Sequence, residues 1–163
     1  MKTLLVLRHA KSSWDDSSLR DHDRPLNPRG VRDAPRMGKL IASEDLVPDA
    51  IISSTARRAL ATAELAAGAM PDAPEIETTR DLYMASPHSY LDVLADHAGA
   101  VDRVMVVGHN PGITALVTRL TGQLEEMPTA ALAVIELDID DWADIHGAKR
   151  GRLAGFWRPK ELG

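Results

Sequence analysis

Two histidines in this chain follow short apolar runs that are typical of buried strands. His9 follows residues 3–8, and His109 follows residues 103–107 and a glycine. The carboxyl ends of parallel strands meet at one edge of an open sheet, which is where ligands bind in such sheets. We therefore expect the two imidazoles to lie together, where one of them could serve as a nucleophile.

Arginines accompany this pattern. Arg8 directly precedes His9, and a third apolar run, residues 50–54, leads into Arg57 and Arg58. A guanidinium matches phosphoryl oxygens with paired donors. The helix dipole disfavours cations at the start of a helix, so an arginine at this position suggests that an anion binds there. We expect one of Arg57 and Arg58 to bind the anion and the other to be solvated. The combination suits a dianionic phosphoryl group.

The elements that must position these residues alternate along the chain. Six strands are predicted at residues 3–8, 50–54, 75–79, 103–107, 131–137 and 152–157, the last as a candidate for antiparallel pairing. Helices are predicted from Pro28 to about Ala42, over 56–67, over 87–98, and from Gly112 to about Leu120. This order predicts an α/β fold, a three-layer α/β/α sandwich with a mostly parallel central sheet.

Some details of these elements are open to test. Val31, Ala34, Met37 and Ile41 are expected to form the buried face of the first helix, and Pro35 is expected to kink that helix or delay its start. Residues 10–26 form a long polar loop, which is typical of a functional or disordered segment. Residues 138–150 are expected to form an acidic loop that contains Trp142, and the run 138–144 within it is expected to be solvated, with metal binding as the lesser alternative.

Composition narrows the class of protein. The 163 residues are 44% hydrophobic, which predicts a single domain over 1–163 with a sizeable core. A net charge of −5 argues against a nucleic-acid partner. The absence of cysteine excludes disulfides, thiol catalysis and cysteine-ligated metal. No apolar stretch approaches the roughly 20 residues of a membrane span, so we expect a soluble, cytoplasmic protein without a membrane partner.

Four motifs, in this order, resemble those of the histidine phosphatase superfamily, also called the phosphoglycerate-mutase-like fold. They are LRHAKSSW at 7–14, DRPLNPRG at 23–30, SSTARRALATA at 53–63 and VGHNP at 107–111. Ala10 stands where glycine is commoner and Thr55 where proline is usual, and Arg58, not Arg57, falls on the functional arginine. The resemblance covers nearly the whole chain and is greatest to the small phosphohistidine phosphatase SixA group.

The resemblance implies a set of roles. His9 would attack phosphorus and carry a transient phosphohistidine, while Arg8, Arg58 and His109, the last as an imidazolium, would hold the phosphoryl oxygens. Arg24 would be a fourth such residue. No cofactor and no metal are implied, because positioning and charge suffice for phosphoryl transfer. Two further residues were considered for substrate binding: Asn110, which could instead cap a helix, and Trp14, which could line the cleft or pack the loop onto the body.

The chain departs from the family where many members carry a glutamate as general acid. The corresponding stretch, residues 81–88, aligns best at Tyr83 or Met84, and neither is a carboxylate. Asp81 or His88 could substitute as the acid. A missing acid would hurt esters with alkoxide leaving groups most and phosphohistidine least, because the imidazole can leave neutral.

Three functions remain open at this point. The first is a phosphatase that hydrolyses phosphohistidine on a partner protein, and the second is a small-molecule phosphomonoesterase that uses Asp81, His88 or an aspartate of the 15–23 loop as acid. The third is a non-catalytic phosphate-binding or phosphoprotein-binding module, although pure binding would not need a nucleophile. The sequence does not define the oligomeric state.

Overall fold

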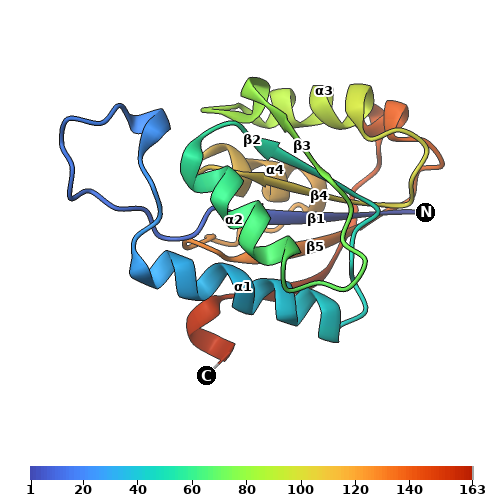
Figure 1. Cartoon of the computed structure of the whole chain (residues 1–163). Helices are drawn as coiled ribbons and strands as arrows, with labels where there is room; N and C mark the ends of the chain where they lie inside the picture. The colour runs from blue at the N-terminus through green and yellow to red at the C-terminus, as the bar shows by residue number, and fades with distance from the viewer. Residues whose placement is uncertain (163) are drawn as a thin grey trace.

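A six-stranded sheet forms the middle layer of this computed structural model, which describes residues 1–162 (Figure 1). The strands lie in the order β3-β2-β4-β1-β5-β6. Their bounds are Lys2–Arg8 (β1), Ala50–Ser54 (β2), Ile76–Thr79 (β3), Arg103–Gly108 (β4), Leu132–Leu137 (β5) and Arg152–Trp157 (β6). β1 to β4 run parallel, and β5 is antiparallel to both β1 and β6. The predicted, mostly parallel sheet is confirmed.

Two helices cover each face of the sheet. α1 (Pro28–Ser43) and α2 (Arg57–Ala67) lie on one face, and α3 (Pro87–His97) and α4 (Gly112–Thr121) lie on the other (Figure 1). Alternate residues of β1 serve the two cores: Leu5 and Leu7 pack with α1 and α2, whereas Leu4 and Val6 pack with α3 and α4. This alternation follows from the two-residue period of a strand, and it confirms the α/β/α sandwich.

The register of the two central strands sets the position of both histidines. β1 and β4 pair in parallel with Arg8 opposite Gly108, so His9 and His109 are the next residues on the two strands. The backbone N–H of His9 donates to the Gly108 carbonyl at 3.0 Å. The two histidines therefore leave the sheet side by side, as expected from the strand ends.

The first helix starts where it was predicted and differs from its prediction at one core position. α1 begins as expected, with Asn27 accepting from the Gly30 N–H, but it continues through Pro35 to Ser43. Val31 is 49% exposed, so its assignment to the core is wrong. At about 100° per residue, Val31 lies roughly 90° away from the centre of the buried face, which Met37 and Ile41 occupy.

The acidic stretch after β5 is more ordered than expected. A short 3-10 helix, η3 (Trp142–Gly147), packs against α3. Trp142 is fully buried, and its indole N–H donates to the Val101 carbonyl at 2.7 Å. The acidic side chains at 138, 140, 141 and 144 are exposed, as expected, but the prediction of an irregular loop is wrong over η3, because the buried ring of Trp142 anchors that segment.

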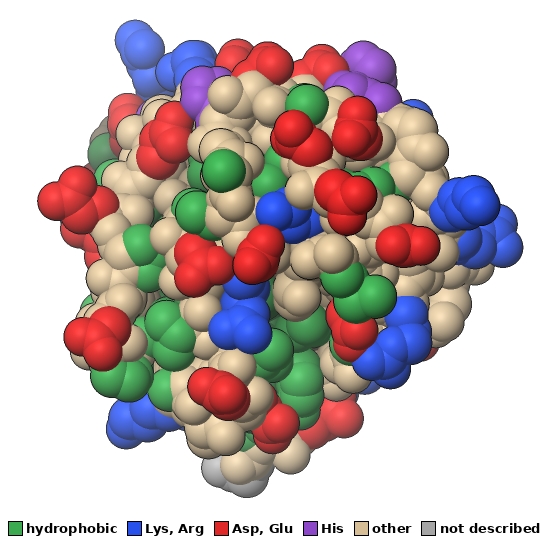
Figure 2. Space-filling view, turned by 90° about the vertical axis from the view of Figure 1, so that its right-hand side faces the viewer, with side chains coloured by type: hydrophobic (Ala, Val, Ile, Leu, Met, Phe, Trp, Pro, Cys, Tyr) green, Lys and Arg blue, Asp and Glu red, His purple; other side chains and the backbone are tan. Residues whose placement is uncertain are grey.

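Surface charge and helix length complete the description of the fold. Figure 2 shows acidic side chains spread over one end of the molecule, with basic side chains between them. Within residues 1–162, every helix is too short or too polar to cross a bilayer.

Candidate active site

The site is built around His9 and His109, whose ring centroids lie 5.1 Å apart. Both side chains are buried, at 7% and 5% exposure. Tyr90 fixes the second histidine, because its hydroxyl accepts from the His109 backbone N–H at 3.1 Å. A Cβ on Gly108 would lie 2.0 Å from that hydroxyl, so only glycine fits before His109.

His9 is held in the state that a nucleophile requires. Its Nδ1–H donates to the Ala10 carbonyl at 2.8 Å, which leaves the lone pair on Nε2. Burial lowers the pKa of His9 to about 3, the charges of His109, Arg58 and Arg8 add to that effect, and the bond to Ala10 opposes it. The imidazole is therefore neutral at pH 7, with Nε2 free to attack.

His109 presents its other ring nitrogen. Its Nε2 lies 2.8 Å from the Ser54 hydroxyl, which accepts from the Ala56 N–H. We infer that the Ser54 hydroxyl donates its hydrogen to His109 Nε2, because the described residues offer that hydroxyl no other acceptor. The hydrogen of the neutral His109 ring is then on Nδ1. Nδ1 is buried and has no hydrogen-bond partner among residues 1–162. Because buried donors are normally hydrogen-bonded, Nδ1–H is a candidate to bind an acceptor atom of a ligand.

The protonation state of His109 differs from the expectation. Burial, followed by the charges of Arg58 and Arg8, lowers the pKa of His109 to about 4, against the opposing charge of Asp21. The free protein therefore carries a neutral imidazole at this position at pH 7, where the sequence predicted an imidazolium. It can still donate through Nδ1–H to an anion.

Two arginines bring positive charge to the histidines. Arg8 donates to the Met127 carbonyl at 2.9 Å, and its buried Nε has no partner among the described residues. Burial and the charge of Arg58 lower the pKa of Arg8. Arg58 is only 7% exposed, whereas Arg57 is exposed to solvent. The structure thus turns Arg58, and not its neighbour, toward the site.

Asp21, from the long loop, completes this arrangement. Its carboxylate accepts from the Tyr83 hydroxyl at 2.6 Å and from Arg58 and Arg24 at 2.9 Å each. The bond from Tyr83 is the largest cause that lowers the pKa of Asp21, and Arg58 and Arg24 add to it. The carboxylate is therefore ionised. The edge of the Tyr83 ring meets His109, with centroids 5.5 Å apart.

Arg24 and Trp14 organise the loop. Besides Asp21, the Arg24 guanidinium donates to the Ser13 carbonyl at 3.1 Å and to the Ser12 hydroxyl at 2.7 Å. Trp14 stacks on that guanidinium and is 72% exposed. The structure thus places Trp14 over Arg24, and Trp14 lines neither of the two pockets described next. Arg24 lies where it holds the loop in place.

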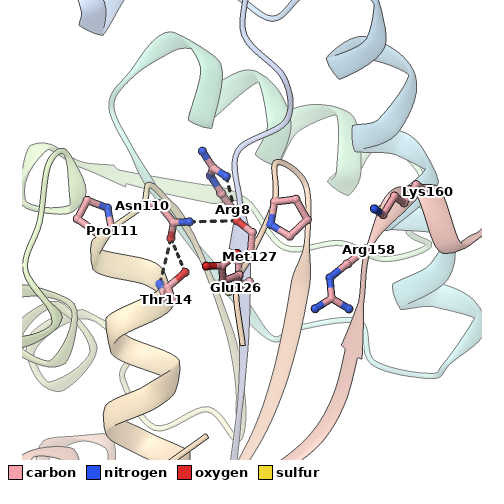
Figure 3. A pocket seen from close by; sticks show the side chains of 9 residues that line it. Arg8, Asn110, Pro111, Thr114, Glu126, Met127, Arg158 and Lys160 are labelled. Carbon is pink, nitrogen blue, oxygen red and sulfur yellow. Dashed lines mark hydrogen bonds between the residues drawn. The ribbon is translucent and has the colours of Figure 1, made fainter. Parts of the chain in front are cut away.

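Two pockets share Asn110 and Pro111, the two residues that follow His109. The first, which we call the Arg8 pocket, has a volume of about 540 Å³, and Arg158 and Lys160 line its far side (Figure 3). The second, the Arg58 pocket, has about 620 Å³ and is also lined by His109 and Asp21. Asn110, which lines both pockets, is held in place by three hydrogen bonds. Its side-chain amide donates to the Met127 carbonyl at 3.0 Å and accepts from the backbone N–H and the hydroxyl of Thr114 at 3.1 and 2.8 Å (Figure 3).

Of the candidate acids, an aspartate of the 15–23 loop, Asp21, reaches the site, whereas Asp81 and His88 lie elsewhere. Asp81 is exposed in a separate pocket with Ser89 and His97. His88 is exposed on α3 and faces Asp92 and His146. The structure brings neither to the histidines, because η2 (Arg80–Leu82) and α3 turn them outward.

Three residues of the site were not singled out from the sequence. Ser54 was only part of a strand, Asp21 was one of several loop aspartates, and Tyr83 was noted only as a residue that is not a carboxylate. Its position at the carboxyl end of a parallel strand could have flagged Ser54. The other two depend on how the loop folds back, which leaves no local signal.

Comparison with known proteins identifies relatives of this chain. A sequence model of the histidine phosphatase superfamily (branch 1) matches residues 4–83. An uncharacterized protein of Mycobacterium tuberculosis is 34% identical to this chain over an alignment of 165 residue positions. The alignment covers 94% of this chain and 100% of that protein.

Two solved structures are also similar to this chain. One, from Agrobacterium tumefaciens and provisionally assigned as phosphohistidine phosphatase SixA, is 32% identical, with a TM-score of 0.80 over 97% of this chain and 99% of that one. A protein histidine phosphatase SixA complexed with tungstate is 21% identical and has the same fold, with a TM-score of 0.83 over 99% of both chains.

Proposed function

The chain belongs to the histidine phosphatase superfamily, and we propose that it hydrolyses phosphohistidine on a partner protein through a phosphorylated His9. One observation carries the proposal. His9 has a neutral imidazole with a free Nε2, and the charges of His109 and Arg8 act on it; within residues 1–162, His109 Nδ1 and Arg8 Nε are buried and have no hydrogen-bond partner. A tetrahedral oxyanion within reach of Nε2 would supply both of those donors with acceptors.

In the first step, phosphoryl oxygens accept hydrogen bonds from Arg8, Arg58 and His109. His9 Nε2 then attacks phosphorus in line with the leaving nitrogen, and the P–N bond of the substrate breaks as the new P–N bond forms. These cationic and polar groups stabilise the charge on the equatorial oxygens. Because the guanidiniums supply the charge, we propose that the step requires no metal.

The state of Asp21 favours phosphohistidine over alkyl esters. An ionised carboxylate cannot give a proton to a leaving group, and an alkoxide needs one. A substrate imidazole that already carries a proton on its other nitrogen leaves neutral without an acid. The absence of a protonated carboxyl beside His9, among the described residues, therefore supports a phosphoramidate substrate.

In the second step, water attacks the phosphorus on His9, and the electrons of the P–N bond return to Nε2. The hydrogen bond from Nδ1–H to the Ala10 carbonyl helps this step, because His9 then departs as a neutral imidazole. Asp21 is the acceptor that we propose for the proton of the water. A carboxylate held ionised suits that role.

The two pockets suggest how a partner protein is accommodated. The Arg8 pocket extends from Arg8 toward Arg158 and Lys160, and we propose that a partner protein approaches along it (Figure 3). We place this reaction in the cytoplasm, as the cysteine-free sequence favours.

A small-molecule phosphomonoesterase is the second candidate. The Arg58 pocket, at about 620 Å³, falls in the size range of small-ligand sites. This function would require Asp21 to become protonated when substrate binds, against the donors that now hold it ionised.

Phosphate release separates the candidates. The purified chain would be offered a histidine-phosphorylated phosphotransfer protein and a panel of alkyl phosphate esters, with chelator present and His9→Ala as control. We expect release from the phosphoprotein that depends on His9. Preference for one ester would support the second candidate, and no release that depends on His9 would leave only a binding module.

A further inference from the structure

A second cluster of metal-ligating side chains lies on the outer side of α3, apart from the phosphatase site. It consists of His88, Asp92 and His146, and we call it the α3–η3 cluster. His146 Nε2 lies 3.0 Å from Asp92 Oδ1, and His88 Nε2 lies 3.5 Å from Asp92 Oδ2. One ligand atom from each residue lies within 4.8 Å of the other two.

The backbone positions of the three ligands are fixed by buried neighbours. His88 and Asp92 are one turn apart on α3, where Tyr90 and Leu91 are fully buried. His146 follows Ile145, which is buried in the same core as Trp142. The cluster thus joins two packed elements of the fold.

The spacing matches a small divalent ion. Zn²⁺ binds imidazole nitrogen at about 2.0–2.1 Å, so neighbouring ligands of a tetrahedral site lie about 3.3 Å apart. The distance of 3.0 Å from Asp92 Oδ1 to His146 and that of 3.5 Å from Asp92 Oδ2 to His88 lie on either side of that value, one for each carboxylate oxygen. The histidine rings are tilted by 47° with centroids 5.1 Å apart, so they are not stacked face to face.

The donor set selects the class of metal. Two imidazoles and one carboxylate suit zinc, cobalt, nickel or copper, whereas magnesium and calcium prefer oxygen ligands alone. All three side chains are exposed, so water can occupy a fourth position.

We propose that the α3–η3 cluster binds one divalent transition-metal ion of the zinc class, which ties η3 to α3. Neither histidine nor Asp92 lines the Arg8 pocket or the Arg58 pocket. The proposal is therefore independent of the proposed function, and chelation should remove this ion without stopping phosphate release.

Calorimetry with zinc chloride tests the proposal on the full chain, prepared without a histidine tag and stripped with chelator. We expect one saturable site per chain and an increase in melting temperature with zinc. His88→Ala and His146→Ala should each weaken binding by about tenfold or more and abolish the increase in melting temperature.

His97→Ala is the matched control, since His97 is an exposed histidine on the same helix that pairs with Glu77 at 2.8 Å. It should bind zinc like the unmodified chain. No saturable binding, or binding that survives His146→Ala unchanged, would overturn the proposal and leave the cluster as an ordinary ion pair between Asp92 and His146.

Discussion

The Arg58 guanidinium donates to the Asp21 carboxylate at 2.9 Å, although 37 residues separate the two in the chain. Asp21 lies on η1 (Asp21–Asp23), at the return of the long polar loop. The loop therefore places the Asp21 carboxylate against Arg58, the arginine that we propose binds the phosphoryl group of the substrate. A substrate has to share this arginine with Asp21 or displace it.

Replacing Asp21 with asparagine should tighten oxyanion binding and slow turnover. A neutral amide no longer repels the ligand, so we expect the dissociation constant of inorganic phosphate to fall by about three- to tenfold. Loss of the proposed proton acceptor should lower kcat by about 10²-fold. Calorimetry with phosphate and steady-state phosphate release measure the two effects.

The exposed Asp15 lies in the same loop, and its side chain takes no part in the site, so Asp15→Asn is the control. It should leave both quantities unchanged. Weaker phosphate binding by Asp21→Asn would mean that the carboxylate only holds Arg58 in place.

The adjacent arginines offer a matched pair of variants. Arg58→Ala should lower kcat/KM by about 10²-fold or more, because it removes a buried guanidinium aimed at the transferring group. Arg57→Ala should stay within about twofold of the unmodified enzyme, since that side chain is exposed. Equal losses in the two variants, measured with the same phosphohistidine substrate, would contradict the assignment of Arg58.

Stability should fall as the pH is lowered from about 6.5 toward about 4. The pKa values of His9 and His109 are about 3 and about 4 in the folded chain, against about 6.5 in an unfolded one. The unfolded state therefore binds more protons in this window, and each histidine contributes up to about 1.4 kcal/mol per pH unit. Urea unfolding at pH 7, 6 and 5 measures the slope, which should flatten in His9→Gln. An unchanged slope in that variant would contradict the lowered pKa.

Gly108→Ala should cost stability. The added methyl group would meet the hydroxyl of the fully buried Tyr90, and we expect overpacking of about 1–3 kcal/mol together with misplacement of His109. Gly147 has open space at the same atom, so Gly147→Ala should be nearly neutral. Thermal unfolding of both variants tests this, and equal melting temperatures would show that Tyr90 moves aside freely.

Local signals were sufficient for much of the fold. The strand ends at His9 and His109 follow apolar runs, and Asn27 with Pro28 marks the start of α1, which the structure confirms. The meeting of the two histidines follows from parallel strands that share an edge. These features depend on short-range pattern and on a general rule of sheet topology.

Other features depend on contacts between distant segments. Asp21 reaches Arg58 and Tyr83 only because Arg24 folds the loop back, and nothing around Asp21 distinguishes it from the other loop aspartates. Val31 fits the helical spacing but lies at the edge of the buried face. Trp142 sits in an acidic stretch, yet its burial against α3 fixes η3.

The identity of the phosphorylated atom tests the account most directly. The enzyme would be mixed with a ³²P-labelled phosphohistidine protein, quenched in alkali within milliseconds, and mapped by peptide mass spectrometry and ³¹P NMR. Since Nδ1 of His9 is bound to Ala10, the account predicts an acid-labile phosphate on Nε2 of His9, absent in His9→Ala. Phosphate on Nδ1 or on another residue, or undiminished turnover by His9→Ala, would contradict it.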